Sequence, residues 1–313
     1  MSSWKSEYPF ESRFLGLIGA SKGSKTSAAN TPAASAVALT SAIKMHFVDE
    51  GPKTSSQTIV CVHGNPTWSF YYRSIIRAFR ADYRCLAIDH VGCGLSDKPQ
   101  DYDYCLTNHV ANFIEWLDRL DLRNVVLVVH DWGGAIGLGA AVARPHRIAK
   151  LLILNTAAFP PPYIPLRIAA CRIPWLGSAA IRYLNAFAGT ATWMAIDRLP
   201  RLSAAAKEGL LYPYRTPSDR IAIDQFVQDI PMVSTHRTYA VLEGLEQKLS
   251  SLANKPTRFV WGMKDWCFRP ECLMRLQKAF PNASVRQLSD VGHYVMEEAD
   301  VEVIEELLRL LES

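Results

Sequence analysis

The sequence lacks the cysteine patterns of a disulfide framework or a structural metal site. Its seven cysteines are odd in number, and no two of them form a Cys-x-x-Cys pair. This usage is typical of a reduced, intracellular protein. The cysteines and the eight histidines also lack the spacing of metal ligands, so we expect no metal. No other cofactor is predicted, because the string Gly92-Cys93-Gly94 lacks the third glycine of a dinucleotide site.

Long apolar runs and clusters of one charge are missing as well. The N-terminus has no apolar core, so we do not expect a signal peptide. The stretch 164–187 is interrupted by prolines and arginines and cannot span a bilayer. The net charge is only +4, and no basic run is interleaved with aromatic residues, so nucleic acid is not an expected partner. We expect a cytoplasmic protein with a small-molecule substrate, and the sequence leaves a homo-oligomer open.

Short apolar strands alternate with helical patterns along the chain. The 313 residues are 49% hydrophobic, enough to bury a large core. Helical spacing of apolar residues occurs at 110–120 and at 301–311, where Asp300 could cap the last helix. Such alternation predicts an α/β fold: a mostly parallel sheet with helices on both faces and a ligand site at the carboxyl ends of the strands. The predicted strands are 45–48, 58–62, 84–88, 125–129, 151–154, 257–261 and 284–288.

Two regions interrupt this alternation. Residues 21–35 are rich in Ser, Ala, Lys and Thr without apolar periodicity, which indicates a flexible insertion at about 19–37, between the first two strands. Residues 157–230 contain prolines, aromatics and helical segments but no convincing strand. We interpret 157–230 as a helical cap over the strand ends, and 1–156 with 231–313 as the core.

One aspartate occurs where a predicted strand meets a helix, in the string VVHDWGG at 128–134. Gly133 and Gly134 let the helix approach the sheet closely and let the turn raise Asp131 above the strand end. The match to the G-x-S-x-G elbow is partial, because Val129 replaces the first glycine and Asp131 the serine. A carboxylate, with an ordinary pKa of about 4, is already anionic and can attack carbon to form an ester. Alternatively, Asp131 only caps the helix.

Two further candidates for catalysis follow predicted strands. Asp265 comes after the strand at 257–261, and His293 comes after the strand at 284–288. Taken singly, a loop histidine is usually structural and an aspartate after a strand usually forms a turn. An aspartate elbow, an aspartate and a histidine, in this order and all at strand ends, together predict a catalytic triad of Asp131, Asp265 and His293.

Four strings at these strand ends form a recognisable set: HGNPT at 63–67, DHVGCGLSDKP at 89–99, HDWGG at 130–134 and GH at 292–293. With them, the chain from about residue 45 onward resembles the haloalkane dehalogenases, a branch of the α/β-hydrolase family. Each string alone is shared with epoxide hydrolases, but the set is specific. The resemblance implies an α/β-hydrolase fold with a helical cap inserted after the sixth strand.

The resemblance also implies roles for five residues. Asp131 would displace a leaving group from an sp³ carbon, and His293, oriented by Asp265, would activate water to hydrolyse the resulting ester. Backbone N–H groups of Trp132 and Asn65 would stabilise the oxyanion of that second step. The indole N–H of Trp132 and the side-chain amide of Asn65 would bind the departing halide.

Details of the resemblance indicate a subgroup. One dehalogenase subfamily has a glutamate after the sixth strand, where this chain has Asn155, so the acid is expected to be Asp265. With Asn65 paired to Trp132, the chain is similar to the third subfamily. The lid tryptophans Trp175 and Trp193 could be extra halide donors, but we expect them to pack in the core.

Several activities are compatible with these residues. Haloalkane dehalogenase is the first hypothesis. The third subfamily is also similar to the β-lactone decarboxylases of bacterial olefin biosynthesis, in which the aspartate would open a strained ring and the departing carboxylate would be lost as carbon dioxide. The residues alone do not separate the two. An epoxide hydrolase would need a lid tyrosine as proton donor, and a non-catalytic receptor on the same fold would bind a ligand without turnover. The available lid tyrosines are Tyr163, Tyr183, Tyr212 and Tyr214.

Overall fold

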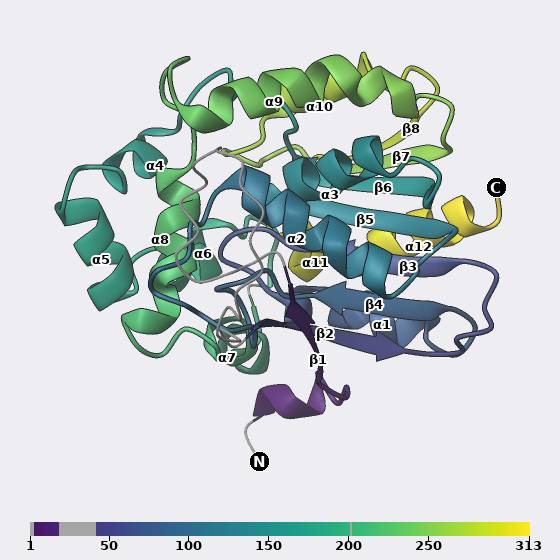
Figure 1. Cartoon of the computed structure of the whole chain (residues 1–313), viewed down its shortest axis with the longest axis horizontal. Coiled ribbons are helices and arrows are strands. Elements are labelled where there is room, and N and C mark those ends of the chain that lie inside the picture. The colour runs from purple at the N-terminus through teal and green to yellow at the C-terminus, as the bar shows by residue number, and fades with distance from the viewer. Residues whose placement is uncertain (1–2, 19–41, 201) are drawn as a thin grey trace, which may run out of the picture.

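A single eight-stranded sheet forms the centre of the molecule (Figure 1). The structure is a computed structural model that describes residues 3–18, 42–200 and 202–313. The strand order is β1-β2-β4-β3-β5-β6-β7-β8; β1 and β2 are antiparallel to their neighbours, and the rest of the sheet is parallel. The strands are β1 (Arg13–Leu17), β2 (Ile43–Glu50), β3 (Thr58–Val62), β4 (Arg84–Ile88), β5 (Val125–Asp131), β6 (Ile148–Thr156), β7 (Thr257–Gly262) and β8 (Ser284–Leu288). The mostly parallel sheet is therefore confirmed, while the flexible insertion expected at about 19–37 lies outside the described residues.

The middle strands carry apolar residues on both faces because helices cover both faces of the sheet. In β5, Leu127 packs with the core that contains Leu138 of helix α3 (Trp132–Ala143), whereas Val126 and Val128 pack with the core that contains Leu307. Every residue of β3 and β5 is buried. This two-sided burial accounts for the unbroken apolar runs of the sequence.

Helices cover both faces of the sheet (Figure 1). Helices α2 and α3 lie on one face, and α1 and α12 lie on the other. The α-helices outside the region between β6 and α9 are α1 (Arg73–Phe79), α2 (Leu106–Arg119), α3 (Trp132–Ala143), α9 (Arg237–Lys248), α10 (Pro270–Gln277), α11 (Val295–Glu298) and α12 (Asp300–Leu311). Short 3₁₀ helices occur at η1 (Ser3–Ser6), η2 (Ser69–Tyr72), η3 (Ser218–Arg220) and η4 (Leu249–Leu252).

The last helix begins one residue earlier than its expected cap implies. Asp300 is the first residue of α12, and Ala299 occupies the N-cap position without a side-chain cap. The carboxylate of Asp300 accepts a hydrogen bond from the N–H of Val301 at 3.0 Å. The prediction that Asp300 caps this helix is therefore wrong, although its charge still lies at the positive end of the helix dipole.

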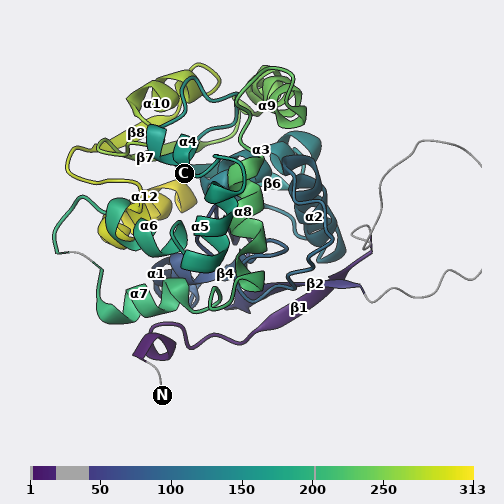
Figure 2. The same ribbon diagram turned by 90° about the vertical axis from the view of Figure 1, so that its left-hand side faces the viewer.

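A helical cap follows β6, the sixth strand, and lies beyond one end of the sheet (Figures 1 and 2). Its helices are α4 (Leu166–Ala170), α5 (Leu176–Leu184), α6 (Ala188–Met194), α7 (Ala204–Leu211) and α8 (Ile221–Gln228). The residue limits of 157–230 for the cap remain a prediction. None of the described helices combines the length and the apolar character needed to cross a membrane.

Candidate active site

Asp131 occupies a strained turn between β5 and α3. Its φ of 52° lies in the left-handed region, which is uncommon for a residue other than glycine. Its side chain makes no N-cap hydrogen bond to α3. Instead, its Oδ1 accepts the backbone N–H of Asn65, from the loop after β3, at 2.6 Å. The alternative interpretation of Asp131 as a plain helix cap is therefore wrong.

Three glycines make room for this turn. A Cβ on Gly64 would collide with the carboxylate of Asp131, and a Cβ on Gly133 would collide with the backbone carbonyl of Val62. A Cβ on Gly134 would collide with the side chain of Thr156 on β6. Gly133 and Gly134 therefore allow the close approach that the sequence predicted. The need for a glycine at position 64 was not predicted, although it stands inside the string at 63–67.

His293 is held in place by Asp265. Nδ1 of His293 lies 2.8 Å from Oδ2 of Asp265, which is buried after β7. The other carboxylate oxygen of Asp265 accepts the backbone N–H groups of Cys267 at 2.7 Å and Phe268 at 3.0 Å. These two bonds fix the carboxylate, which in turn fixes the orientation of the imidazole ring.

The other ring nitrogen of His293 faces Asp131. Nε2 of His293 and Oδ2 of Asp131 are 3.8 Å apart, and both side chains are buried. Burial raises the pKa of Asp131, while the nearby charge of His293 and the backbone N–H groups of Trp132 and Asn65 oppose that rise. For His293, burial alone would lower the pKa, but the charge and hydrogen bond of Asp265 and the charge of Asp131 raise it above its ordinary value. Asp131, His293 and Asp265 thus form one coupled chain of charges.

The side chain of His130 forms a hydrogen bond with the backbone of His293. Nε2 of His130 donates to the backbone carbonyl of His293 at 2.9 Å, and the two rings lie 4.7 Å apart. Burial lowers the pKa of His130 well below its ordinary value, so it donates as a neutral ring. The ring of Phe268 stacks on His293 at 5.7 Å. Neither contact was predicted, although His130 directly precedes Asp131 in the sequence.

Asn155 stabilises the end of β6. Its Nδ2 donates to the carbonyl of Gly262 at 2.9 Å, and its Oδ1 accepts the N–H of Gly262 at 2.7 Å. This amide therefore ties β6 to β7, and the acid that contacts His293 comes from the loop after β7.

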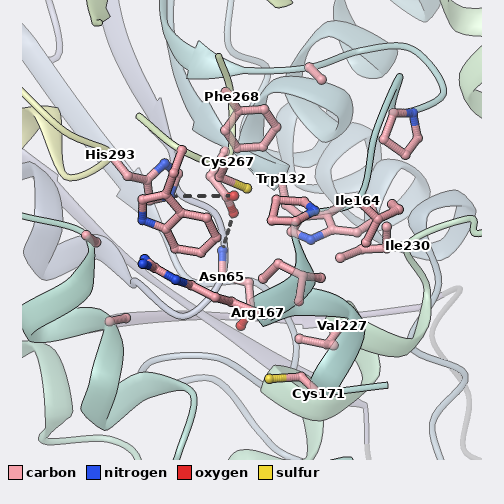
Figure 3. A pocket seen from close by; sticks show the side chains of 18 of the residues that line it. Asn65, Trp132, Ile164, Arg167, Cys171, Val227, Ile230, Cys267, Phe268 and His293 are labelled. Carbon is pink, nitrogen blue, oxygen red and sulfur yellow. Dashed lines mark hydrogen bonds and ion pairs between the residues drawn. The ribbon is translucent and has the colours of Figure 1, made fainter. Parts of the chain in front are cut away.

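A cavity of about 250 Å³ opens in front of Asp131. Its walls are mostly apolar, and residues of the cap form a large part of them. Figure 3 shows apolar side chains such as Ile164, Val227 and Ile230 around the same cavity as Asn65, Trp132 and His293. A cavity of this kind fits a small apolar ligand with one reactive group.

Comparison with known proteins agrees with this architecture. A family model described as the alpha/beta hydrolase fold matches residues 57–300, which is more than half of the chain.

The chain belongs to the α/β-hydrolase family.

Relatives of this α/β-hydrolase carry two different activities in their names. It is 40% identical to a cis-3-alkyl-4-alkyloxetan-2-one decarboxylase of Shewanella oneidensis over 267 residues, 83% of each chain. It is 32% identical to haloalkane dehalogenase 2 of Mycobacterium bovis over 273 residues, 82% of this chain and 87% of the relative. The tetrameric haloalkane dehalogenase DpaA from Paraglaciecola agarilytica NO2 superposes with a TM-score of 0.76 at 25% identity, covering 97% of this chain and 93% of that one. The predicted fold and family are thus confirmed.

Asn65 contacts both Asp131 and the cap of this α/β-hydrolase. Its backbone N–H donates to Asp131, while its side-chain Nδ2 donates to the carbonyl of Ile223 on α8 at 3.2 Å. Its Oδ1 is buried and has no hydrogen-bond partner among the described residues. Trp132 lines the cavity beside it and packs against Phe226 with ring centroids 5.4 Å apart. One of the two side-chain amide hydrogens of Asn65 is thus hydrogen-bonded to the cap.

The lid tryptophans are not where the sequence predicted them. Trp175 is 89% exposed and Trp193 is 62% exposed, so the expected core packing is wrong for both. Neither lines the cavity. Trp266 does line it, but its indole N–H donates to the carbonyl of Met194 at 2.9 Å. The guanidinium of Arg167 lies 5.1 Å from the Trp266 ring.

The lid tyrosines do not present free hydroxyl groups to the cavity. Among the four candidates only Tyr163 lines it. Its hydroxyl donates to the carbonyl of Cys267 and accepts the backbone N–H of Arg269 at 3.2 Å. Tyr294, which was not predicted, also lines the cavity directly after His293.

Proposed function

We propose that this α/β-hydrolase uses Asp131 as a covalent nucleophile on an apolar substrate, and that the substrate is a cis-3,4-dialkyl-β-lactone, which becomes an olefin and carbon dioxide. The observation that carries the proposal is the carboxyl side chain of Asp131 on a strained elbow at the end of an apolar cavity. Similarity favours this substrate over a haloalkane, because the oxetanone decarboxylase is 40% identical and the dehalogenase 32% identical over similar lengths.

The first step opens the strained ring. A carboxylate oxygen of Asp131 attacks the sp³ ring carbon that is bonded to the ring oxygen, and the bond between that carbon and the ring oxygen breaks. The electron pair stays on the departing oxygen, which becomes part of a free carboxylate on the neighbouring carbon. Asp131 is then an alkyl ester, and no proton has been transferred.

The second step restores the enzyme. The carbon–carbon bond to the free carboxylate breaks and releases carbon dioxide, and its electron pair forms the double bond. The ester bond to Asp131 breaks at the same time and returns the carboxylate. Both steps balance without water, so His293 acts here as a neighbouring positive charge rather than as a base.

The oxygen that becomes anionic needs hydrogen-bond donors or a positive charge nearby. In our proposal the indole of Trp132 and the remaining amide N–H of Asn65 face the cavity side of Asp131. His293, whose pKa is raised by Asp265 and Asp131, lies 3.8 Å from the carboxylate of Asp131. These are the groups we assign to binding a departing carboxylate, or equally a halide.

Haloalkane cleavage is the second candidate, favoured by the dehalogenase neighbours. There the halide would leave as the Asp131 ester forms, and water would then attack the ester carbonyl. Ester formation removes the charge of Asp131, one of the groups that raise the pKa of His293. The pKa of His293 would therefore fall, and the ring would become a base at the step that needs one.

Two other functions fit the site less well. An epoxide hydrolase needs a hydroxyl or other acid to protonate the opening oxygen, but the Tyr163 hydroxyl is already bonded to backbone groups. A non-catalytic receptor would not need the chain of contacts from Asp265 through His293 to Asp131.

The test compares two substrates on one preparation of the protein. A cis-dialkyl β-lactone should give olefin, measured by gas chromatography, and a bromoalkane series should release little bromide. His293→Gln sharpens the comparison: olefin formation should survive, because it uses no water, whereas dehalogenation would stop at the ester. Rapid bromide release with no olefin would reject the decarboxylase proposal in favour of the dehalogenase.

A further inference from the structure

The cap exposes large apolar side chains on the helices that surround the cavity. Six of them, which we call the lid face, are 62% to 89% exposed. They lie on or next to α4, α5 and α6, which project together from the side that Figure 2 turns toward the viewer. The lid face consists of Leu166, Trp175, Leu176, Tyr183, Leu184 and Trp193.

Helix α5 is apolar on both sides. Gly177 and Ile181 are buried and face the protein, whereas Leu176 and Tyr183, two turns apart on the outer side, are exposed. A helix on a water-exposed surface usually carries polar residues on its outer face. The only charged residue within α5 is Arg182. Its outer face therefore suits an apolar environment better than water.

The chain segment that carries the lid face has charges of one sign. Residues 157–196 contain three arginines and no aspartate or glutamate. Arg172 and Arg182 donate to backbone carbonyls of the cap, including those of Val227 and Pro217. Arg167 is exposed and forms no ion pair with a described carboxylate. Exposed aromatic and aliphatic residues next to arginines are complementary to anionic lipid headgroups above acyl chains.

The cavity opens within the lid face. Its exposed lining residues include Arg167 and Thr190. Leu166 is the direct neighbour of Arg167, and Trp193 follows Thr190 by one turn of α6. Apolar side chains thus border the opening through which a ligand reaches Asp131.

We propose that the lid face rests on an anionic phospholipid bilayer, with Trp175, Tyr183 and Leu184 inserted at the headgroup level and the cavity opening toward the lipid. An apolar substrate can then pass from the bilayer to Asp131 without crossing water. This last step rests on the proposed function, but the docking does not.

The docking is tested by flotation of the full chain with vesicles of phosphatidylcholine alone or mixed with phosphatidylglycerol. The wild type should float with the mixed vesicles. The double variant Trp175→Ser/Leu184→Ser should lose at least about tenfold in partitioning, because both side chains would otherwise leave water. The matched control Met274→Ser/Val301→Ser removes exposed apolar residues from α10 and α12 and should float like the wild type. Equal melting temperatures verify that both variants fold.

The charge is tested separately with Arg167→Gln, which should lower partitioning into the mixed vesicles by about fivefold at low salt. A wild type that floats with neither vesicle would overturn the proposal, and so would equal losses in the lid-face and control variants. Should the wild type instead form an oligomer that Trp175→Ser/Leu184→Ser dissociates, without vesicle binding, a second copy covers the face and the proposal is rejected. Flotation needs no turnover, so these outcomes are independent of the olefin assay.

Discussion

At the scale of single residues, the proposed reaction depends on keeping a buried carboxylate charged. Burial raises the pKa of Asp131, and His293, with the N–H groups of Trp132 and Asn65, counteracts the rise. In the proposed reaction, these neighbouring groups therefore favour the anionic form of Asp131 that would attack. The pH dependence of the reaction should report this balance.

We predict that kcat/KM falls on the acid side with an apparent pKa above the ordinary aspartate value, because the attacking form of Asp131 is the anion. His293→Gln removes the positive neighbour that lowers the pKa of Asp131, so the acid limb should move to higher pH. The measurement is the pH profile of kcat/KM for olefin formation. His146 is exposed, so the control variant His146→Gln should leave the apparent pKa of the acid side unchanged. A limb that moves to lower pH in His293→Gln would contradict this account of the charges.

The sequence could predict that Asp131, Asp265 and His293 lie together, because each stands at or after the end of a strand and the carboxyl ends of parallel strands meet at one edge. Their catalytic roles remain a prediction. The lid tryptophans could not be placed, because Trp175 precedes a helix that is apolar on both sides. The bond from Asn65 to Ile223 joins residues 158 positions apart, and no local pattern encodes it.

At the scale of elements, strand prediction succeeded for the buried middle of the sheet and for one of its edges. The bounds of β3, β4 and β8 are those predicted, whereas no residue range was predicted for β1. Strand β1 is an edge strand of five residues with only Leu17 buried. An edge position alone does not explain this difference, because β8 is also an edge strand with only Leu288 buried, and its bounds were predicted.

The junction of β5 and α3 gives a prediction at this scale. Gly133→Ala should destabilise the protein by more than about 2 kcal/mol, because the new Cβ meets rigid backbone of β3. Urea unfolding measures the change. Gly244→Ala is the matched control: it also adds one methyl to a helix, but nothing lies within 4 Å, so it should stabilise by about 0.5–1 kcal/mol through helix propensity. Equal effects of the two substitutions would show that the close approach at the elbow is not required.

At the scale of the whole molecule, the N-terminal segment packs against both the cap and the core. Trp4 on η1 is buried; its ring lies 4.3 Å from Tyr212, just after α7, and 5.9 Å from Trp68, just before η2. The residues of this aromatic cluster come from three distant parts of the sequence. Such a cluster is a tertiary feature that periodicity along the chain does not predict.

Trp4→Ala should therefore cost about 3–5 kcal/mol in the free energy of unfolding and should speed amide exchange in α7. Trp175→Ala, which removes the same side chain from an 89% exposed position, should change stability by less than about 0.5 kcal/mol. Urea unfolding and hydrogen exchange measure both. If Trp4→Ala were as mild as Trp175→Ala, the aromatic cluster would not fasten the cap.

In the whole molecule, the elbow of Asp131, the apolar cavity and the lid face follow one another from the sheet outward. The cap contributes most to this arrangement, because its helices supply cavity walls on their inner side and the lid face on their outer side. The proposed function thus depends on one chemical step at the base of the cavity, the attack of Asp131 on a carbon of the substrate.

That event is tested most directly by the yield of olefin and carbon dioxide from a cis-3,4-dialkyl-β-lactone with the wild type, Asp131→Asn and the control Asp101→Asn, which changes an exposed aspartate. Burial raises the pKa of Asp131, so its ionisation opposes folding at neutral pH, and the neutral asparagine should leave the melting temperature unchanged or higher. The account predicts both products from the wild type and from Asp101→Asn, and a rate at least about 10³-fold lower from folded Asp131→Asn. Olefin formation by Asp131→Asn at the rate of the wild type would contradict it.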